Sequence, residues 1–100
     1  MKYYVYAHVC PIADEIVYIG YGSRDRAWKF PPFNNKHRNS LRSPEHISWM
    51  ENLYLTLNFT PADWVKIVET FDNKQAACKV EQELIKKFRP VFNKDQKDVQ

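Results

Sequence analysis

The chain has 100 residues, of which 44% are hydrophobic, 15% aromatic and 27% charged, and its formal net charge is +3. This length suits a single domain over residues 1–100, with residues 94–100 as a tail, and the composition excludes a disordered or fibrous protein. No apolar run approaches the roughly 18 residues of a membrane span, and the beginning lacks the apolar stretch of a signal peptide. We therefore expect a cytoplasmic protein (in the host cytoplasm, if a phage encodes it) with no membrane partner.

Two segments near the beginning have the β-branched and aromatic composition of strands. They cover residues 3–9 and 15–21, and their short connection favours an antiparallel hairpin. Because side chains alternate along a strand, Tyr4, Tyr6 and His8 should share one face.

The next segments predict helices and a loop. Ser23 is a plausible N-cap for a short helix over residues 24–30, and residues 31–43 have the polar composition of a loop. Ser43 followed by Pro44 is typical of a second helix start. The apolar residues that then recur at helical spacing are Ile47, Met50, Tyr54 and Leu57.

The last third of the chain predicts a turn, a strand and a helix. Residues 58–63 are typical of a turn, and residues 64–70 of a third strand. Asp72 and Gln75 predict a capping box for a final helix that ends near Phe88. The resulting order indicates an α+β domain with a small three-stranded antiparallel sheet flanked by about three helices.

The two cysteines, Cys10 and Cys78, are far apart and do not form a Cys-x-x-Cys motif. Secreted scaffolds held by disulfides contain more cysteines than this. We therefore expect free thiols that serve as small apolar residues in a reducing compartment.

The excess positive charge is concentrated in residues 21–46, which contain only two acidic residues. The six basic residues there are Arg24, Arg26, Lys29, Lys36, Arg38 and Arg42. Aromatic residues, among them Tyr21, are interleaved with them, and this combination suits a phosphate backbone and exposed bases. The segment is a candidate nucleic-acid-binding surface, with a solvated loop as the alternative.

One residue of the final helix does not fit its surroundings. At about 100° per residue, Glu81 falls in the middle of the apolar arc, whereas Glu83 falls on the far side. The arc consists of Ala77, Val80, Leu84, Ile85 and Phe88. A buried carboxylate costs free energy unless it is paired or binds a cation. Glu81 should therefore contact either a Lys or Arg side chain or a metal ion.

Several short motifs occur in a characteristic order. Tyr-Val-Tyr stands at residues 4–6 and Tyr-Ile-Gly at residues 18–20, and a Gly-x-Gly pattern with an arginine follows at residues 20–26. Residues 81–93 contain Glu, then Leu-Ile, then Pro and finally Asn. In this order the motifs resemble the GIY-YIG nuclease superfamily over residues 4–93.

The chain departs from that family at two positions. Tyr4 stands where the first motif has glycine, and Tyr21 stands where lysine is common. Tyrosine at position 21 would either remove a phosphate contact or let its ring stack on a base instead. Gly20 and Gly22 are the only glycines. They would support the site through a positive φ or through close approach of the backbone.

The resemblance implies phosphodiester hydrolysis with one divalent cation, Mg²⁺ or Mn²⁺. Glu81 and water molecules would hold the ion, which suits the hydrated coordination of Mg²⁺. Tyr6 is the candidate base, with Tyr18 bonded nearby to the water or the phosphate. Arg26 would grip the scissile phosphate through its planar guanidinium.

Other site assignments retain an ordinary alternative. His37 is either the base itself or the partner of a tyrosine, and Arg24 competes with Arg26 for the phosphate. The resemblance implies that Asn93 braces the Glu81 region, although it is also typical of a turn. The tyrosines of the two strands would otherwise form a cross-strand aromatic pair. His8 and His46 are interpreted as ordinary strand and helix residues.

The sequence therefore predicts a metal-dependent DNA endonuclease acting on duplex or branched DNA, as a homodimer if both strands are cut. The alternative is a catalytically silent GIY-YIG-like module that binds nucleic acid or another protein, for example a phage-encoded inhibitor. The buried Glu81 distinguishes these two hypotheses, because a nuclease needs it to hold the metal ion, whereas binding alone does not need it.

Overall fold

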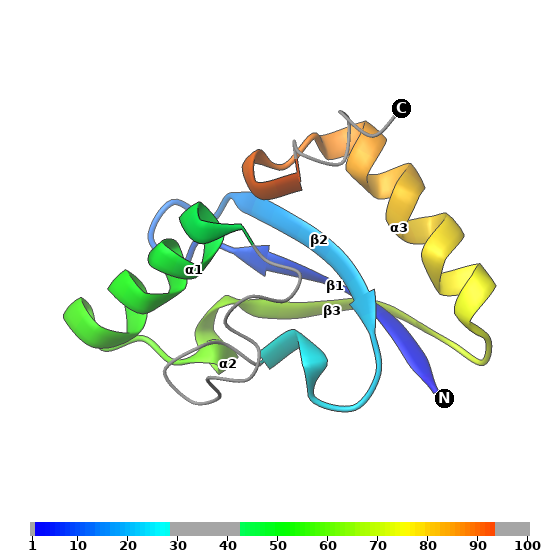
Figure 1. The fold of residues 1–100 in the computed structure, drawn as a ribbon, viewed down its shortest axis with the longest axis horizontal. Helices are drawn as coiled ribbons and strands as arrows, with labels where there is room; N and C mark the ends of the chain where they lie inside the picture. Colours follow the sequence, from blue (N-terminus) through cyan, green and yellow to red (C-terminus); the bar gives the residue numbers. More distant parts are fainter. Residues whose placement is uncertain (1, 29–42, 94–100) are drawn as a thin grey trace.

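The computed structural model describes residues 2–28 and 43–93 and shows a three-stranded antiparallel sheet with helices around it (Figure 1). The strands are β1 (Tyr3–Val9), β2 (Ile16–Gly22) and β3 (Val65–Phe71). β1 is the central strand and pairs antiparallel with both neighbours, so that β2 and β3 form the two edges. The predicted α+β class and the predicted hairpin are confirmed.

The helical elements differ in length and type. They are η1 (Arg26–Trp28), α1 (Pro44–Glu51), η3 (Asn52–Thr56), α2 (Pro61–Trp64) and α3 (Lys74–Phe88). η1 is a single 3-10 turn and η3 is a π-helical turn. Within the described residues, no helix is long and apolar enough to cross a membrane.

Alternation of side chains along the strands divides the apolar residues into two clusters. On one face, Tyr6 and Tyr18 pack with residues of η1, α1, η3 and α2, including Ala27 and Met50. On the other face, the residues packed together are Val5, Ala7, Ile19, Ala77 and Ile85. α1 and α3 thus contribute to opposite faces of the sheet, as the period-two pattern of the strands requires.

The helix that begins at Ser43 is interrupted after two turns. Ser43 caps it as predicted, because its hydroxyl accepts the His46 N–H at 3.1 Å. In η3, however, the Leu57 N–H bonds to the Asn52 carbonyl at 3.2 Å, five residues back. Such a wide turn rotates the following side chains. Leu53 is therefore buried, and Leu57 is 42% exposed, contrary to the predicted stripe.

Three helix starts differ from the sequence prediction. A one-turn helix, α2, replaces the predicted turn, with a capping box between Thr60 and Asp63. The N-cap of α3 is Asn73, whose Oδ1 accepts a main-chain N–H of the first turn at 2.8 Å, so the predicted box at Asp72 is wrong. η1 is shorter than the predicted helix, whose last two residues lie outside the described ones. Neighbouring Asp and Asn cap equally well, and the place where β3 ends selects between them.

The burial of α3 follows the sequence pattern except at its end. Ala77 and Ile85 are buried, and Glu81 is only 5% exposed, as its place in the apolar arc predicts. Phe88, assigned to the same arc, is about half exposed. It is the last helical residue, and the chain turns away at Arg89, which adopts the left-handed conformation (φ 47°).

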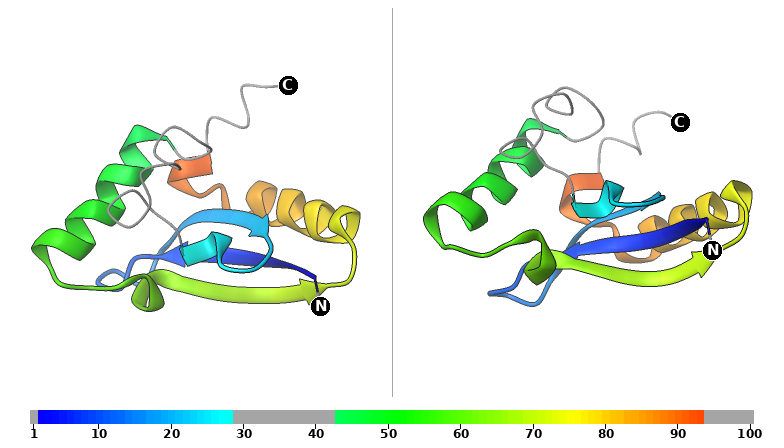
Figure 2. Two further views of the ribbon diagram at one scale, coloured as in Figure 1. Left: turned by 60° about the horizontal axis from the view of Figure 1, so that its bottom comes forward. Right: turned by 90° about the horizontal axis from the view of Figure 1, so that it is seen from below.

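Asn93 holds the edge strand β2 from the turn at residues 91–93, which lies against that strand in Figure 2. Its Oδ1 accepts the Ile19 N–H at 2.7 Å, and its Nδ2 donates to the Ile19 carbonyl at 3.0 Å. The side-chain amide thus completes one step of a ladder on β2. These bonds go to β2 beside Tyr18, and Ile19 packs against Ala77 and Ile85 of α3, so any support of the Glu81 region by Asn93 acts through β2.

We expect Asn93→Ala to destabilise the fold, since it removes two buried hydrogen bonds and leaves the main-chain groups of Ile19 unpaired. The loss in unfolding free energy should be about 2–4 kcal/mol, measured by urea denaturation. Val91→Ala is the control, because Val91 lies in the same turn but is 51% exposed. It should cost about 0.5 kcal/mol or less. Equal losses in the two variants would contradict the assignment.

Candidate active site

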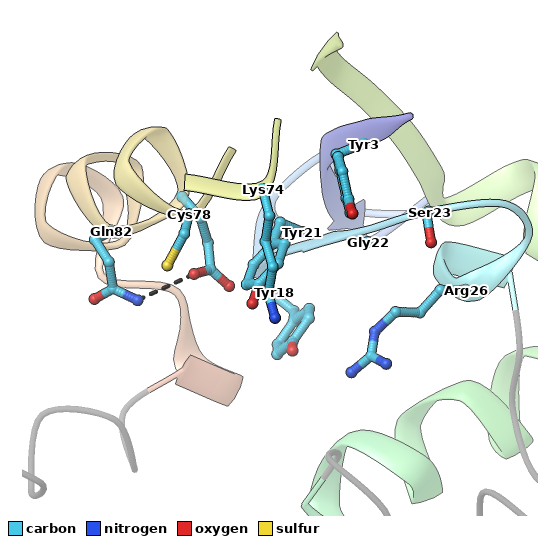
Figure 3. Close-up of a pocket in the computed structure, with 10 residues that line it drawn as sticks. Tyr3, Tyr18, Tyr21, Gly22, Ser23, Arg26, Lys74, Cys78 and Gln82 are labelled. Atoms are coloured by element: carbon cyan, nitrogen blue, oxygen red, sulfur yellow. Dashed lines mark hydrogen bonds between the residues drawn. The ribbon is translucent and has the colours of Figure 1, made fainter. Parts of the chain in front are cut away.

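A cavity of about 550 Å³ lies where β2, η1 and α3 meet (Figure 3). Three residues predicted as catalytic, Tyr18, Arg26 and Glu81, line it together. Tyr21 and Gly22, also assigned to the site, line it as well. Residues separated by up to 63 positions in the sequence therefore meet at one edge of the sheet.

The two tyrosines lie on the same face of the sheet but are not directly paired. Tyr6 is opposite Gly20, and Tyr18 is opposite His8. The tyrosine rings are diagonal neighbours with centroids 6.1 Å apart. Tyr18 lines the cavity, whereas Tyr6 is buried on the central strand and is not among the described residues that line it.

Gly20 lets the tyrosine rings approach the backbone of β2. A Cβ atom at Gly20 would lie 2.8 Å from the Tyr6 hydroxyl oxygen and 2.9 Å from Cε2 of Tyr18. The Tyr6 ring therefore lies over Gly20 of β2, next to the Tyr18 ring. Neither glycine of the described chain has a positive φ, so close approach is the reason for glycine here.

Gly22 has the same relation to Arg26. A Cβ atom at Gly22 would lie 2.7 Å from Cδ of Arg26, so the arginine stem passes directly over the glycine. Figure 3 shows the guanidinium directed into the cavity, on the side of η1. Arg24, the competing arginine, is exposed and does not line the cavity. Of the two candidate arginines, only Arg26 therefore lies at the cavity.

Glu81 presents a buried carboxylate to this cavity. Its Oε1 accepts a hydrogen bond from Nε2 of Gln82 at 3.0 Å. Within residues 2–28 and 43–93, no Lys, Arg or His forms an ion pair with it. Burial raises the pKa of the Glu81 carboxyl, and the Gln82 bond and the charge of Arg26 offset this only in part. The ion-pair alternative from the sequence is thus not realised among these residues.

Sequence reasoning missed a second basic residue at the cavity. Lys74, in the first turn of α3, lines it and extends toward Tyr18 and Tyr21 in Figure 3. Cys78 also lines it, and the thiols of Cys78 and Cys10 are both free, as expected. The signal was present in the sequence, because positions 74, 78 and 81 recur at helical spacing and share one face of α3.

Several assigned residues cannot be compared with this site. The candidate base His37 and four of the basic residues lie outside the described residues, namely Lys29, Lys36, Arg38 and Arg42. Their expected roles stay predictions. Of the predicted nucleic-acid-binding set, Tyr21 lines the cavity, whereas Arg24 is exposed on the turn after β2 and does not line it.

The residues at the cavity fit a hydrated divalent cation with one protein ligand. No group of three or more His, Cys, Asp or Glu side chains occurs in the described part of the chain, so a fully protein-coordinated ion has no site there. Mg²⁺ retains several waters and takes as few as one or two carboxylates. A buried carboxylate with a raised pKa gains most from such a cation, because the cation offsets its desolvation.

No protein-family model matches the chain, and no curated protein or solved structure is significantly similar to it.

Glu81 should make the metal-free protein less stable as the pH rises. Its raised pKa means that the folded protein binds this proton more tightly than the unfolded chain. Stability is then highest below the unfolded-state pKa and falls as the pH rises through the folded-state pKa. In EDTA at neutral pH, Glu81→Gln should therefore be more stable than the wild type, and this advantage should shrink in acid.

Urea denaturation between about pH 4 and about pH 8 measures this difference. Glu83→Gln is the matched control for the loss of a carboxylate, because Glu83 is exposed on the same helix. A wild type that is more stable than Glu81→Gln throughout would show that the carboxylate is already well satisfied.

Proposed function

We propose that this protein is a metal-dependent DNA endonuclease related to the GIY-YIG nucleases. The observation that carries the proposal is the cavity in which the Glu81 carboxylate, buried and without an ion pair in the described chain, faces Arg26 and Tyr18. Phosphodiester hydrolysis needs a metal ion, a proton acceptor for water and positive charge at the phosphate. The residues that line the cavity include a candidate for each requirement, namely Glu81 for the metal ion, Tyr18 for the proton and Arg26 for the phosphate.

Glu81 is the residue that would hold the cation, together with water molecules. A bound Mg²⁺ or Mn²⁺ would supply electrophilic stabilisation of the phosphate and would lower the pKa of a bound water. A structural role does not explain the burial of this carboxylate, because burial penalises its charge. A glutamine at position 81 would occupy the same space without the free-energy cost of burying a charge.

Arg26 would bind the scissile phosphate. Its guanidinium can contact two phosphate oxygens at once, and it stays charged at every accessible pH. Lys74 adds a second positive charge from α3, across the cavity from η1. The side chains of Arg26 and Lys74 would contact an anion from two sides of the cavity, which Glu81 also lines.

One tyrosine of the pair would take up the proton of the attacking water while its own hydroxyl proton passes to a neighbouring acceptor, for which His37 is the candidate. Tyr18 stands at the cavity wall, and Tyr6 lies behind it with its hydroxyl over Gly20. Phenylalanine variants of the two tyrosines separate their roles, since the base should show the larger loss in rate. His37 keeps its predicted role as base or partner and enters the same comparison.

DNA is the proposed substrate because part of the cavity lining, including Tyr21 and Arg26, belongs to residues 21–46, the part of the sequence that holds the excess positive charge. Tyr21, at the cavity, offers an aromatic face for base stacking. Cleavage of both strands of a duplex would need a second copy of the chain or two successive nicks.

Conversion of supercoiled plasmid to open circles in Mg²⁺ or Mn²⁺ tests the proposal. We expect Glu81→Gln and Arg26→Ala each to lower the rate by about a hundredfold or more, and EDTA to abolish it. Glu83→Gln should cut like the wild type, because Glu83 is exposed on the same helix. Equal cutting by the wild type and Glu81→Gln would show that the activity does not come from this site.

A second measurement separates absent catalysis from absent metal binding. Mn²⁺ should raise the melting temperature of the wild type and of Glu83→Gln but not of Glu81→Gln, because only a folded site binds the ion. A folded wild type that neither cuts several DNA substrates nor responds to Mn²⁺ would favour the silent binding module.

A further inference from the structure

We propose that Tyr4 and His8 are positioning residues for Arg26, acting through Ala27. This inference rests on the proposed function, in which Arg26 binds the scissile phosphate. Both residues lie on the central strand β1, and neither lines the cavity among the described residues. Between them they bind both main-chain polar groups of the residue that follows Arg26.

The contacts come from one face of β1. The Tyr4 hydroxyl accepts the Ala27 N–H at 3.1 Å and donates its own proton to the Arg24 carbonyl at 2.7 Å. On the other side of the turn, His8 Nε2 lies 2.9 Å from the Ala27 carbonyl. Ala27 itself is completely buried. The segment that carries Arg26 is thus tied to the sheet at three main-chain atoms.

The bond to the Ala27 carbonyl determines the tautomer of His8. A carbonyl oxygen only accepts, so Nε2 of His8 carries the hydrogen. In the neutral ring, Nδ1 is then an acceptor, and it lies 2.9 Å from Nε2 of His46, which donates to it. Both rings are completely buried. His46 follows the helix start at Ser43, so α1 orients the His8 ring that holds η1.

The Tyr4 hydroxyl is suited to its double role. Burial raises the pKa of Tyr4, although the Ala27 bond acts in the opposite direction, so the hydroxyl keeps its proton at neutral pH. The ring is also fixed by edge contacts to Tyr6 and Trp28, with centroids 5.9 Å apart in each case. A phenylalanine at this position would keep these ring contacts and lose only the hydroxyl.

The turn needs this support because it is too short to hold a side chain by itself. Its own bonds are 3-10 bonds, from the Arg26 N–H to Ser23 at 3.2 Å and from the Trp28 N–H to Asp25 at 3.0 Å. Single turns of this kind are weak. In addition, Arg24 has a φ of 55°, which is unfavourable for a residue with a side chain. The bonds to β1 therefore fix where the Arg26 guanidinium points.

Tyr4→Phe tests the inference first by amide hydrogen exchange, which does not require catalysis. We expect the Ala27 amide of the wild type to exchange slowly and that of Tyr4→Phe to exchange at least about tenfold faster. Tyr54→Phe is the control, since it removes a hydroxyl from η3, outside the described site. Unchanged protection of Ala27 in a folded Tyr4→Phe protein would overturn the inference.

Steady-state nicking kinetics test whether the support acts through Arg26. We expect Tyr4→Phe to lower kcat about ten- to a hundredfold with little change in KM, and to cause no further loss when combined with Arg26→Ala. An equal loss in both backgrounds would show that Tyr4 acts independently of Arg26 and would contradict the proposal. So would wild-type rates for a Tyr4→Phe protein in which the Ala27 amide exchanges fast.

His8 provides the second variant. His8→Gln keeps an N–H donor near the Ala27 carbonyl, whereas His8→Leu keeps only the bulk. We expect His8→Gln to regain at least about tenfold of the rate that His8→Leu loses. Equal rates for the two would overturn the role of His8. If the wild type does not cut DNA at all, the proposed function fails, and the exchange experiment still decides the positioning claim.

Discussion

The burial of one carboxylate is the constraint around which the site is organised. Glu81 lies on the apolar face of α3, and burial raises its pKa because the charged form is poorly solvated. The amide of Gln82 and the distant charge of Arg26 compensate only in part. A cation in the adjoining cavity would supply the remaining compensation.

The remaining features of the site are close contacts and hydrogen bonds around the edge strand β2 and the turn that follows it. Gly20 admits the tyrosine rings, and Gly22 admits the stem of Arg26. Asn93 closes the ladder on the outer side of β2 through Ile19. From the central strand β1, the Tyr4 hydroxyl and the His8 imidazole bind Ala27 in the turn that carries Arg26.

Local signals in the sequence were sufficient to predict most of the helices and strands and part of the candidate site. Strand alternation, the Ser43 cap and the misplaced Glu81 depend on residues within a few positions of one another, and each agrees with the structure. Features that depend on how distant segments meet could not be predicted. The paired imidazoles of His8 and His46 join residues 38 positions apart, and neither position is unusual within its own element. The π turn of η3 and the exposure of Phe88 likewise follow from tertiary packing, which overrides helical periodicity.

Binding of Mn²⁺ at the cavity, followed by electron paramagnetic resonance of the free ion, tests the central claim most directly because it requires neither a DNA substrate nor turnover. If Glu81 is buried in order to hold a divalent cation, the wild type and Glu83→Gln should each remove one equivalent of Mn²⁺ from solution, and Glu81→Gln should remove none. Binding that persists in Glu81→Gln, or no binding by the folded wild type, would contradict the account.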